Sequence, residues 1–225
     1  IMEIARNKKL KKLIYASSSS IYGNSSKTPF SEDFDTSSPL QFYGSTKKAG
    51  EVFLKTYNYL YGFPVICLRF FTVYGPWGRP DMALFKFANK VSKNKSIDVY
   101  NSGNMWRDFT YIDDLCESIK RLINLPPKKI KHKVSSKNKY ISSMAPFEIV
   151  NIGNQKAISL KELIKALEKS FGKRFKKNKL PIQLGDVPFT LSDSTLLKKL
   201  TGFSPNTDIQ DGVNKFYEWY IKHYE

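Results

Sequence analysis

Two apolar runs with a helix-like segment between them constrain the fold of this chain most strongly. Leu13–Ala16 is a short apolar run, and residues 64–71, PVICLRFF, form a nearly continuous one. Such a run is typical of a parallel strand that is covered on both faces. Between them, residues 43–61 carry apolar side chains at the spacing of an amphipathic helix, and Gly62 follows as a stop signal. Strand, helix and strand in this order predict a βαβ unit and an α/β fold.

The rest of the pattern adds helices and short strands to this unit. The 225 residues are enough for one large domain or one and a half ordinary ones. Polar and basic residues at 125–145 interrupt the pattern and predict a mobile surface loop. The spacing predicts further strands over 96–100 and 147–153, and further helices over 83–91, 113–124, 159–171 and 208–224.

Charge and hydropathy limit the kinds of partner. The net charge is +17, but the lysines are scattered and lack interleaved aromatic residues, so we expect no nucleic-acid partner. No apolar run approaches the roughly 20 residues that span a bilayer, and no signal peptide is visible, so no membrane partner is expected. Cys67 and Cys116 are expected to be buried and reduced, which favours a cytoplasmic location.

A tyrosine and a lysine at the start of the long predicted helix are candidates for proton transfer. Tyr43 and Lys47 are four residues apart, so a helix places both side chains on one face. An ammonium group beside a phenol favours the phenolate, which can act as a general base. The sequence holds 13 tyrosines among many lysines, so an ordinary surface pair is the alternative interpretation.

Four consecutive serines, residues 17–20, follow the first apolar run. A solvated loop is the usual interpretation of such a run. In an open α/β sheet, however, ligands bind at the carboxyl ends of the strands. Hydroxyl groups at this strand end can therefore point into a site, and the helix of Tyr43 follows them in the chain.

Serine, tyrosine and lysine in this arrangement resemble the proton-handling set of the short-chain dehydrogenase/reductase superfamily. The chain is most similar to its extended branch, the NAD-dependent epimerases and dehydratases of nucleotide sugars, and within that branch to the UDP-glucuronate 4-epimerases. The segment GPWGRPDM is the most specific part of the resemblance, because galactose-type epimerases differ there. The segments that carry it, in family order, are YASSSSIYG, YGSTKKAGE, LRFFTVYGPWGRPDMA, RDFTYIDD and LPIQLGDVPFT.

The resemblance implies a two-part architecture. Residues 1–75 would be the C-terminal part of a Rossmann-like doubly wound sheet that carries the serine, tyrosine and lysine site. Residues 76–225 would be the nucleotide-sugar-binding region, which holds a smaller α/β substrate-binding domain and is partly interleaved with the Rossmann-like part through the strand and helix near 107–124. The implied activity is inversion at C4 of a UDP-sugar through a 4-keto intermediate, with NAD as cofactor, in the synthesis of surface polysaccharide precursors.

The resemblance also assigns roles to individual residues, and no metal site is expected. Tyr43 would be the catalytic base, Ser18 would share its hydrogen bond to the sugar, and Lys47 would support Tyr43 and contact the nicotinamide ribose. Arginine suits bidentate recognition of carboxylate and phosphate, and six of the 37 basic residues are arginine. The remaining implied roles are Phe70 beside the nicotinamide, Ser19 and Ser20 in the sugar pocket, Thr72 near the diphosphate and sugar, Arg79 on the sugar carboxylate, Arg107 on the diphosphate, and Tyr100 and Asp186 on the uridine.

The Gly-x-x-Gly-x-x-Gly turn that holds the NAD pyrophosphate in this family is absent from the sequence. At about 30 residues per βαβ unit, about 100 residues of the family pattern are expected to be missing before residue 1. NAD binding by this chain alone is therefore expected to be weak, and whether the chain is itself an enzyme stays open. It would be a fragment of a longer enzyme, one product of a split gene that pairs with a separate N-terminal NAD-binding chain, or an inactive remnant. A homodimer is a further possibility, and a basic non-enzymatic binding module is the alternative from another class.

Overall fold

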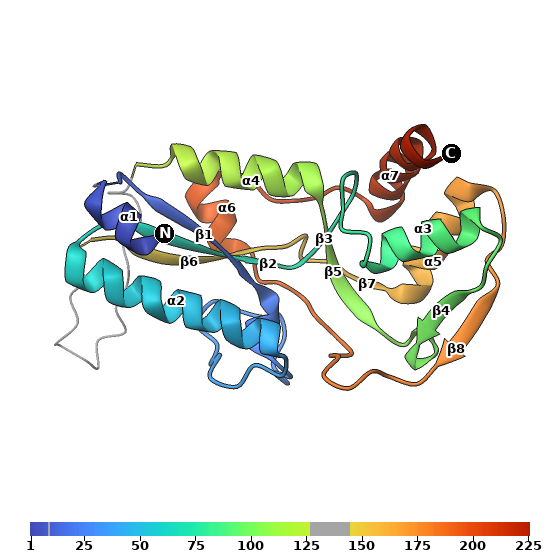
Figure 1. Ribbon diagram of the computed structural model, residues 1–225, viewed down its shortest axis with the longest axis horizontal. Coiled ribbons are helices and arrows are strands. Elements are labelled where there is room, and N and C mark those ends of the chain that lie inside the picture. The colour runs from blue at the N-terminus through green and yellow to red at the C-terminus, as the bar shows by residue number, and fades with distance from the viewer. Residues whose placement is uncertain (9, 127–144) are drawn as a thin grey trace.

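The computed structural model describes residues 1–8, 10–126 and 145–225, which form two groups of elements along the long axis of the molecule (Figure 1). No helix in these ranges has both the length and the hydropathy to cross a membrane. The first group contains α1 (Met2–Asn7), β1 (Leu13–Ser18), η1 (Ser19–Tyr22), α2 (Phe42–Tyr61), β2 (Val65–Phe70), α4 (Ile112–Asn124), β6 (Phe147–Ile152) and α6 (Thr195–Thr201). The second contains β3 (Thr72–Tyr74), α3 (Ala83–Ser92), β4 (Ile97–Tyr100), η2 (Asn101–Gly103), β5 (Trp106–Tyr111), β7 (Ala157–Ser159), α5 (Leu160–Phe171), β8 (Lys177–Leu180) and α7 (Ile209–Tyr224).

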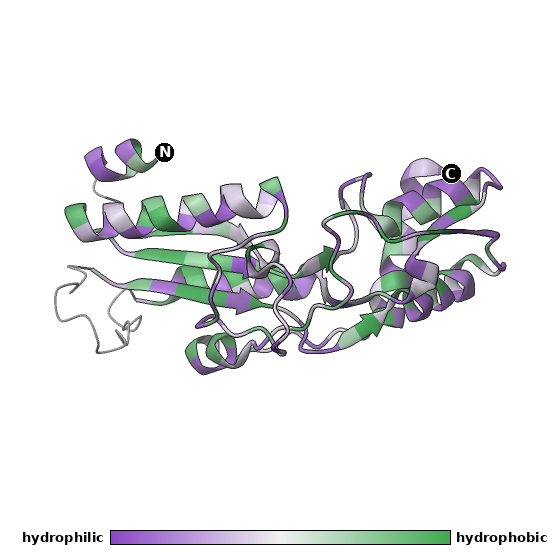
Figure 2. Cartoon of the chain, turned by 90° about the horizontal axis from the view of Figure 1, so that it is seen from below, coloured by the Kyte–Doolittle hydropathy of each residue, from purple (hydrophilic) through white to green (hydrophobic). Residues whose placement is uncertain are grey.

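A three-stranded parallel sheet with helices on both faces forms the first group. The strand order is β1-β2-β6. On β2, Ile66 and Leu68 pack towards α4 and α6, whereas Val65 and Cys67 pack towards α1 and α2. Figure 2 shows the apolar bands along these strands. Coverage on both faces explains the continuous apolar run of β2, and the predicted Rossmann-like α/β fold is confirmed.

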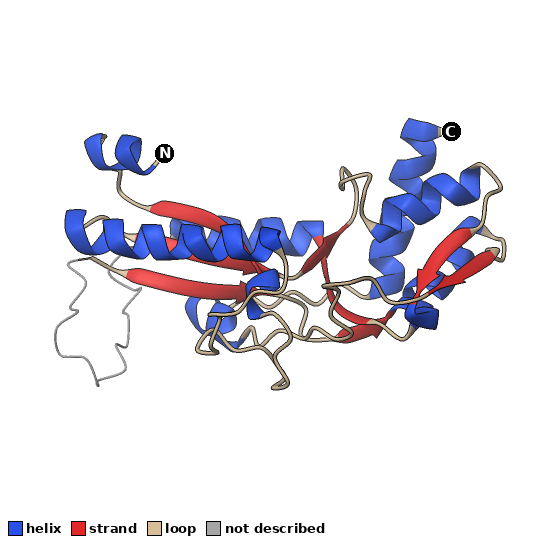
Figure 3. Cartoon of the chain, turned by 60° about the horizontal axis from the view of Figure 1, so that its bottom comes forward, coloured by secondary structure: helices blue, strands red, loops and turns tan. Residues whose placement is uncertain are grey.

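The second group is built around an aromatic core between short strands and three helices. β5 pairs parallel with β3 and antiparallel with β7, and β4 pairs parallel with β8. Phe85 on α3 contacts Phe216 and Tyr220 on α7 edge-on, and this cluster is buried. Figure 3 shows the β4–β8 pair at the end of the molecule opposite to α1.

Some elements and one side chain differ from the sequence-based expectations. The strands β3, β7 and β8 and the helix α6 were not predicted, because they are short and β8, KNKL, is mostly exposed and polar. Cys116 is exposed rather than buried, because it lies on the solvent side of α4, whose inner side carries Leu115 and Leu122. Most of the predicted loop at 125–145 lies outside the described residues.

The chain passes between the two groups several times. After β5, it returns to the first group in α4, which packs on β2 and β6. The next element, β6, belongs to the same sheet, and after β7, α5 and β8 the chain returns again in α6, whose Leu197 lies in the same core. The division at residue 75 therefore remains a proposal, in which segments beyond residue 124 must also be counted with the Rossmann-like part.

Candidate functional site

The serine run forms a tight turn at the carboxyl end of β1. Ser18 is the last residue of the strand and caps the 3-10 helix η1, because its Oγ accepts the N–H of Ser20 at 3.1 Å. The Ser18 hydroxyl also donates to Ser20 Oγ at 3.1 Å. Phe70 is the register partner of Ser18 on β2, so both lie in the last row of the sheet. The serines are thus part of an ordered strand end, where α/β proteins bind ligands.

The first turns of α2 bring Tyr43 and Lys47 to the same end of the sheet. Lys47 Nζ donates to the carbonyl oxygen of Ala16 at 2.9 Å and lies 5.5 Å from the ring centroid of Tyr43. The side chain of Tyr43 is 46% exposed. At Gly44, a Cβ would lie 2.6 Å from the carbonyl oxygen of Ser20, so this helix packs on η1 at a distance that requires glycine. The predicted catalytic residues therefore share one edge.

A cavity of about 140 Å³ lies next to this edge. It is lined by segments that are distant in the sequence, from η1, the start of β3, the start of β5 and the stretch after β8. These segments bring together residues that were each predicted to bind substrate: Ser19, Ser20, Thr72, Arg107 and Asp186.

An ion pair crosses the cavity wall. Arg107 NH2 lies 2.7 Å from Asp186 Oδ1, and Arg107 NH1 donates to the carbonyl oxygen of Trp106 at 2.9 Å. Burial lowers the pKa of the Arg107 guanidinium, and the charge of Asp186 opposes this shift. Gln41, immediately before α2, donates to the carbonyl oxygen of Gly185 at 2.9 Å. The segment that carries Asp186 is thereby tied to both groups of elements.

A buried carboxylate holds the strand of Arg107 in place. Asp108 is fully buried and accepts the backbone N–H groups of Asn154 at 2.7 Å, Gln155 at 3.0 Å and Ser192 at 2.9 Å. The hydroxyl of Ser192 donates to it at 2.5 Å. Burial raises the pKa of Asp108, and these hydrogen bonds oppose the rise. The sequence interpretation missed this residue, although a carboxylate inside the strand-like segment RDFTY is a signal for such a role.

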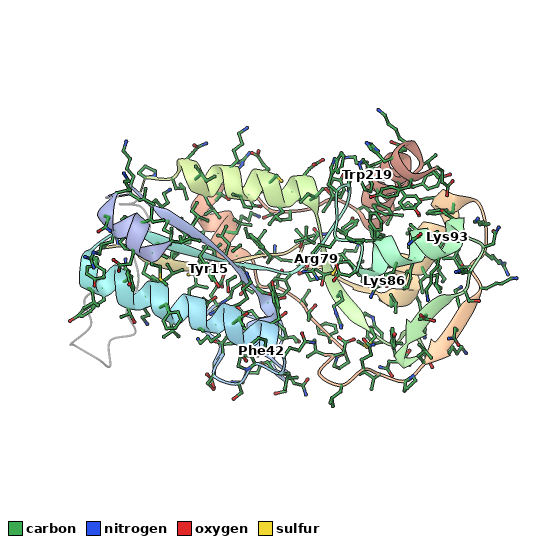
Figure 4. All side chains as sticks on the ribbon, viewed as in Figure 1. Tyr15, Phe42, Arg79, Lys86, Lys93 and Trp219 are labelled. Atoms are coloured by element: carbon green, nitrogen blue, oxygen red, sulfur yellow. The ribbon has the colours of Figure 1, made fainter. Side chains whose placement is uncertain are left out.

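Arg79 lies in the middle of the molecule, between the first sheet and α3 (Figure 4). Its side chain is 69% exposed and forms a bidentate pair with Asp81, with Nε–Oδ1 3.0 Å and NH2–Oδ2 2.6 Å. The Asp81 carboxylate raises the pKa of Arg79, and Tyr43 lies close enough to add to the rise. In the same loop, the ring of Trp77 packs on Trp219 with centroids 5.2 Å apart. Arg79 is therefore an exposed guanidinium whose fork is occupied by a carboxylate of its own loop.

Six of the predicted site residues do not line the cavity: Ser18, Tyr43, Lys47, Phe70, Arg79 and Tyr100. Tyr100 ends β4 and does not line this cavity, so its contact with uridine stays a prediction. Phe70 packs partly buried against the core below α4, at the sheet edge that Ser18 shares. The roles of the other predicted site residues are likewise proposals.

The sequence interpretation also missed a buried ion pair behind the site. Arg69 on β2 and Glu51 on α2 are 1% and 3% exposed, with Nε–Oε1 3.0 Å and NH2–Oε2 2.9 Å. The signal in the sequence is an arginine within the apolar run PVICLRFF, since a charge buried in such a strand needs a partner.

The sequence is similar to those of known proteins over its whole length. The chain is 47% identical over 225 residues to Protein CapI of Staphylococcus aureus, covering 100% of this chain and 67% of that protein. It is 44% identical over 225 residues to a probable UDP-glucuronate 4-epimerase of Rhizobium meliloti (strain 1021), covering 100% of this chain and 66% of that protein. The chain thus spans about two thirds of the length of these relatives.

A solved structure and a family model agree with this similarity. The structure of UDP-glucuronic acid 4-epimerase from Bacillus cereus, in complex with UDP-glucuronic acid and NAD, matches with a TM-score of 0.85 and 32% identity. The match covers 99% of this chain and 65% of that one. The model of the NAD dependent epimerase/dehydratase family matches residues 1–136, more than half of the sequence. The chain therefore belongs to the NAD dependent epimerase/dehydratase family.

Proposed function

We propose that this chain provides the sugar-nucleotide side of an NAD-dependent UDP-sugar 4-epimerase whose substrate is UDP-glucuronate. The cavity beside the strand ends carries this proposal, because it gathers hydroxyl, guanidinium and carboxylate groups from distant segments. Its position next to the Tyr43 and Lys47 edge supports a transfer reaction on a bound sugar. The names of the relatives support the choice of substrate.

The chemistry of the cavity fits a nucleoside diphosphate. Arg107 presents a planar guanidinium, which suits the oxygens of a diphosphate. The carboxylate of Asp186, 2.7 Å away, is an acceptor for the hydroxyl groups of a ribose. The hydroxyls of Ser19, Ser20 and Thr72 line the part of the cavity nearest to η1 and β3, where we place the sugar. Tyr100 is proposed to contact the uridine from outside this cavity.

The catalytic step uses Tyr43 and Ser18. The phenolate of Tyr43 accepts the proton of the sugar 4-hydroxyl, while the Ser18 hydroxyl shares that hydrogen bond. NAD, when bound, would supply hydride chemistry at C4: after the 4-keto sugar turns over, hydride would return to its other face and the Tyr43 hydroxyl would return the proton to O4, which inverts C4. Lys47 and Tyr43 fit such a cofactor, because an ammonium and a hydroxyl at the edge of a parallel sheet can hold ribose hydroxyls. Phe70 would border the nicotinamide from the same edge.

Arg79 is proposed to hold the C6 carboxylate of the substrate. In the structure its fork already binds a carboxylate, that of Asp81, with the geometry that a uronate requires. A 4-keto uronate is a β-keto acid and can lose carbon dioxide. A guanidinium that keeps the carboxylate paired as an anion opposes this loss, because decarboxylation moves the charge away from the carboxylate. Arg79 would therefore set both the choice of substrate and the fate of the intermediate.

A product assay tests this function. Because the relatives are longer than this chain, the assay uses the chain joined to the part of the Staphylococcus aureus relative that the chain does not cover. We expect conversion of UDP-glucuronate and about 10- to 100-fold slower conversion of UDP-glucose, because UDP-glucose lacks the carboxylate that would take Arg79 from Asp81. Tyr43→Phe should abolish turnover and keep UDP binding. Equal rates on both substrates, or full activity of Tyr43→Phe, would contradict the proposal.

The other interpretations predict different results in the same experiments. An inactive remnant would bind UDP-glucuronate in the joined protein without turnover. A separate NAD-binding partner would be indicated if the chain alone binds NAD weakly in calorimetry and binds it strongly after that N-terminal chain is added. Sedimentation of the chain alone would reveal a homodimer. A basic binding module would bind DNA or RNA tightly, with a steep dependence on salt. We also propose a role in surface polysaccharide synthesis, which the family resemblance supports, and a cytoplasmic location, which the two free cysteines support.

A further inference from the structure

A row of polar side chains crosses the first sheet just before its carboxyl edge. Ser17, Arg69 and Asn151 are register partners on β1, β2 and β6. All three are at most 2% exposed. Side chains alternate between the two faces of a strand, and the odd-numbered positions that precede this row on β2, Val65 and Cys67, face α2. This polar row therefore points towards α2, within a surface that is otherwise apolar.

Glu51 of α2 completes the row with a carboxylate. It accepts two hydrogen bonds from Arg69, and Ser17 Oγ donates to Glu51 Oε1 at 2.7 Å. Burying two charges costs several kcal/mol per ion, and apolar residues of similar volume often stabilise a fold better. The stability of the fold is therefore not a sufficient reason for this ion pair.

The other end of the row is tied to η1 and β6. Arg69 NH1 donates to Tyr22 Oη at 2.9 Å, and Tyr22 Oη donates to Asn151 Oδ1 at 2.7 Å. Asn151 Nδ2 donates to the carbonyl oxygens of Phe30 at 2.8 Å and Asp193 at 3.2 Å. The hydrogen bonds thus run without interruption from α2, through the sheet and η1, to the segment before α6.

Four members of this network lie close in the chain to residues of the candidate site. Ser17 precedes Ser18, and Arg69 precedes Phe70. Glu51 is one helical turn after Lys47, on the same side of α2. Tyr22 ends the 3-10 helix that carries Ser19 and Ser20. The network therefore connects the strand end, the turn and the helix on which the proposed catalytic groups are placed.

We infer that the buried pair Glu51–Arg69, with the polar row, is a positioning element that fixes the first turns of α2 relative to the end of β1. Glu51, Arg69, Ser17 and Tyr22 are positioning residues, and they act through Ser18, Tyr43 and Lys47. An ion pair with two parallel hydrogen bonds fixes distance and orientation together, which an apolar contact does not. This inference rests on the proposed function, in which a proton passes between the sugar and Tyr43.

The decisive variant removes both charges at once. Glu51→Leu/Arg69→Met fills the space with apolar side chains, so it is expected to fold with a thermal midpoint equal to or above that of the parent. In the joined enzyme its kcat for UDP-glucuronate should fall about 100-fold, as for a misplacement near 1 Å, while KM stays within about threefold. Ser17→Ala, a milder change, should lower kcat in the same direction without unfolding the protein.

Two control variants separate positioning from stability. Glu117→Gln/Arg121→Gln also removes both charges, in this case from a more exposed pair on α4, and should change neither kcat nor the thermal midpoint by a comparable amount. Ile164→Val weakens the core of the second group without touching the network, and its activity should follow the folded fraction. If the activity of the double variant also follows its folded fraction, or if its kcat is unchanged, the positioning role is overturned.

Hydrogen–deuterium exchange on the chain alone gives a measurement that does not depend on the substrate. In the double variant, amides of residues 18–22 and 43–48 should exchange faster, whereas those of α5 should keep their rates. If no UDP-sugar is converted by the parent enzyme, the proposed function fails and this measurement decides the inference. Unchanged exchange in both segments would then overturn it, and faster exchange confined to them would support it.

Discussion

Two arginine–carboxylate forks with nearly the same geometry lie in opposite environments in this molecule. Arg69 and Glu51 are joined by hydrogen bonds of 3.0 and 2.9 Å, and their side chains are 2% and 3% exposed. Arg79 and Asp81 are joined by bonds of 3.0 and 2.6 Å, and their side chains are 69% and 57% exposed. The same chemical group can therefore fix an architecture where water is excluded, and can exchange its partner for a substrate where water is present.

Burial decides which of the two roles is open to a fork. Exposed ion pairs contribute about 0–1 kcal/mol in general, so another carboxylate can replace a member at little cost. A buried pair cannot open without leaving a charge unpaired in the interior, which costs about 3–5 kcal/mol. The comparison predicts that removing one partner of the buried fork destabilises the fold, whereas removing one partner of the exposed fork changes substrate handling without a change in stability.

The largest expected effect follows from removing one partner of the buried fork. Glu51→Ala should lower the free energy of unfolding by about 3–5 kcal/mol, because the charge of Arg69 stays buried without a counter-charge. Asp81→Ala should cause no measurable change. Urea denaturation followed by tryptophan fluorescence measures both. Equal effects of the two substitutions would remove the distinction between the forks.

The exposed fork should control catalysis. Arg79→Ala is expected to lower kcat/KM for UDP-glucuronate about 100-fold in the joined enzyme, because the C6 carboxylate loses its bidentate partner. Arg79→Lys should keep weak activity and release decarboxylated product. Chromatography of the product nucleotides measures both effects, and Arg121→Ala, at an exposed arginine of α4, is the matched control. A normal rate of Arg79→Ala would show that the carboxylate is held elsewhere.

Glu148 extends the comparison to a carboxylate that faces like charges. Burial, and then the charges of Glu32 and Asp33, raise the pKa of Glu148 to about 7. The folded protein therefore holds this proton more tightly than the unfolded chain does. The free energy of unfolding should fall as the pH rises from the ordinary carboxyl pKa, about 4.5, through 7.

Substitution of Glu148 tests this pH dependence. Glu148→Gln should raise the urea midpoint at pH 8, where the parent carboxylate is charged, and leave it unchanged at pH 4. Glu117→Gln, at a partly exposed position of α4, should not change the urea midpoint by a comparable amount at either pH. If Glu148→Gln changed the urea midpoint by the same amount at pH 4 and at pH 8, the assigned pKa would be contradicted.

The smallest expected effect concerns competition within the exposed fork. The Arg79 hydrogen bonds lower the pKa of Asp81, so its carboxylate is charged and competes with the substrate for Arg79. Asp81→Asn should weaken this competition and lower the KM for UDP-glucuronate about threefold, in keeping with the modest strength of exposed pairs. The KM for UDP-glucose, which has no carboxylate, is the internal control. An increased KM for UDP-glucuronate would instead assign Asp81 a direct role in binding.

The sequence predicts the strand–helix–strand unit well because its signals are local. The run PVICLRFF and the periodicity of residues 43–61 each describe one element, and the serine run lies where a strand must end. The shorter strands were harder, because three residues of β3 or β7 carry too little periodicity to be distinguished from a loop. β8 is stabilised by pairing with β4, which no local pattern records.

In the candidate site, too, residues in local motifs could be predicted from the sequence, whereas residues that act through contacts between distant segments could not. Tyr43, Lys47 and Ser18 belong to short motifs, and Arg107 and Asp186 came from the family resemblance. Three buried residues behind the site were missed: Glu51 and Arg69 are 18 positions apart, and Asp108 binds segments more than 40 positions away. Such contacts follow from the packing of elements, so they become visible when the fold is known.

The repeated return of the chain to its first sheet has a consequence for recombination and protein engineering. α4 and β6 come after β5 of the second group, and α6 comes after β8, yet all three belong to the layers of the first sheet. No single cut therefore separates the two groups into contiguous cassettes. A change of the proposed sugar specificity would therefore not result from exchanging one block of sequence. It would require substitutions at scattered positions that leave the segments connecting the two groups unchanged.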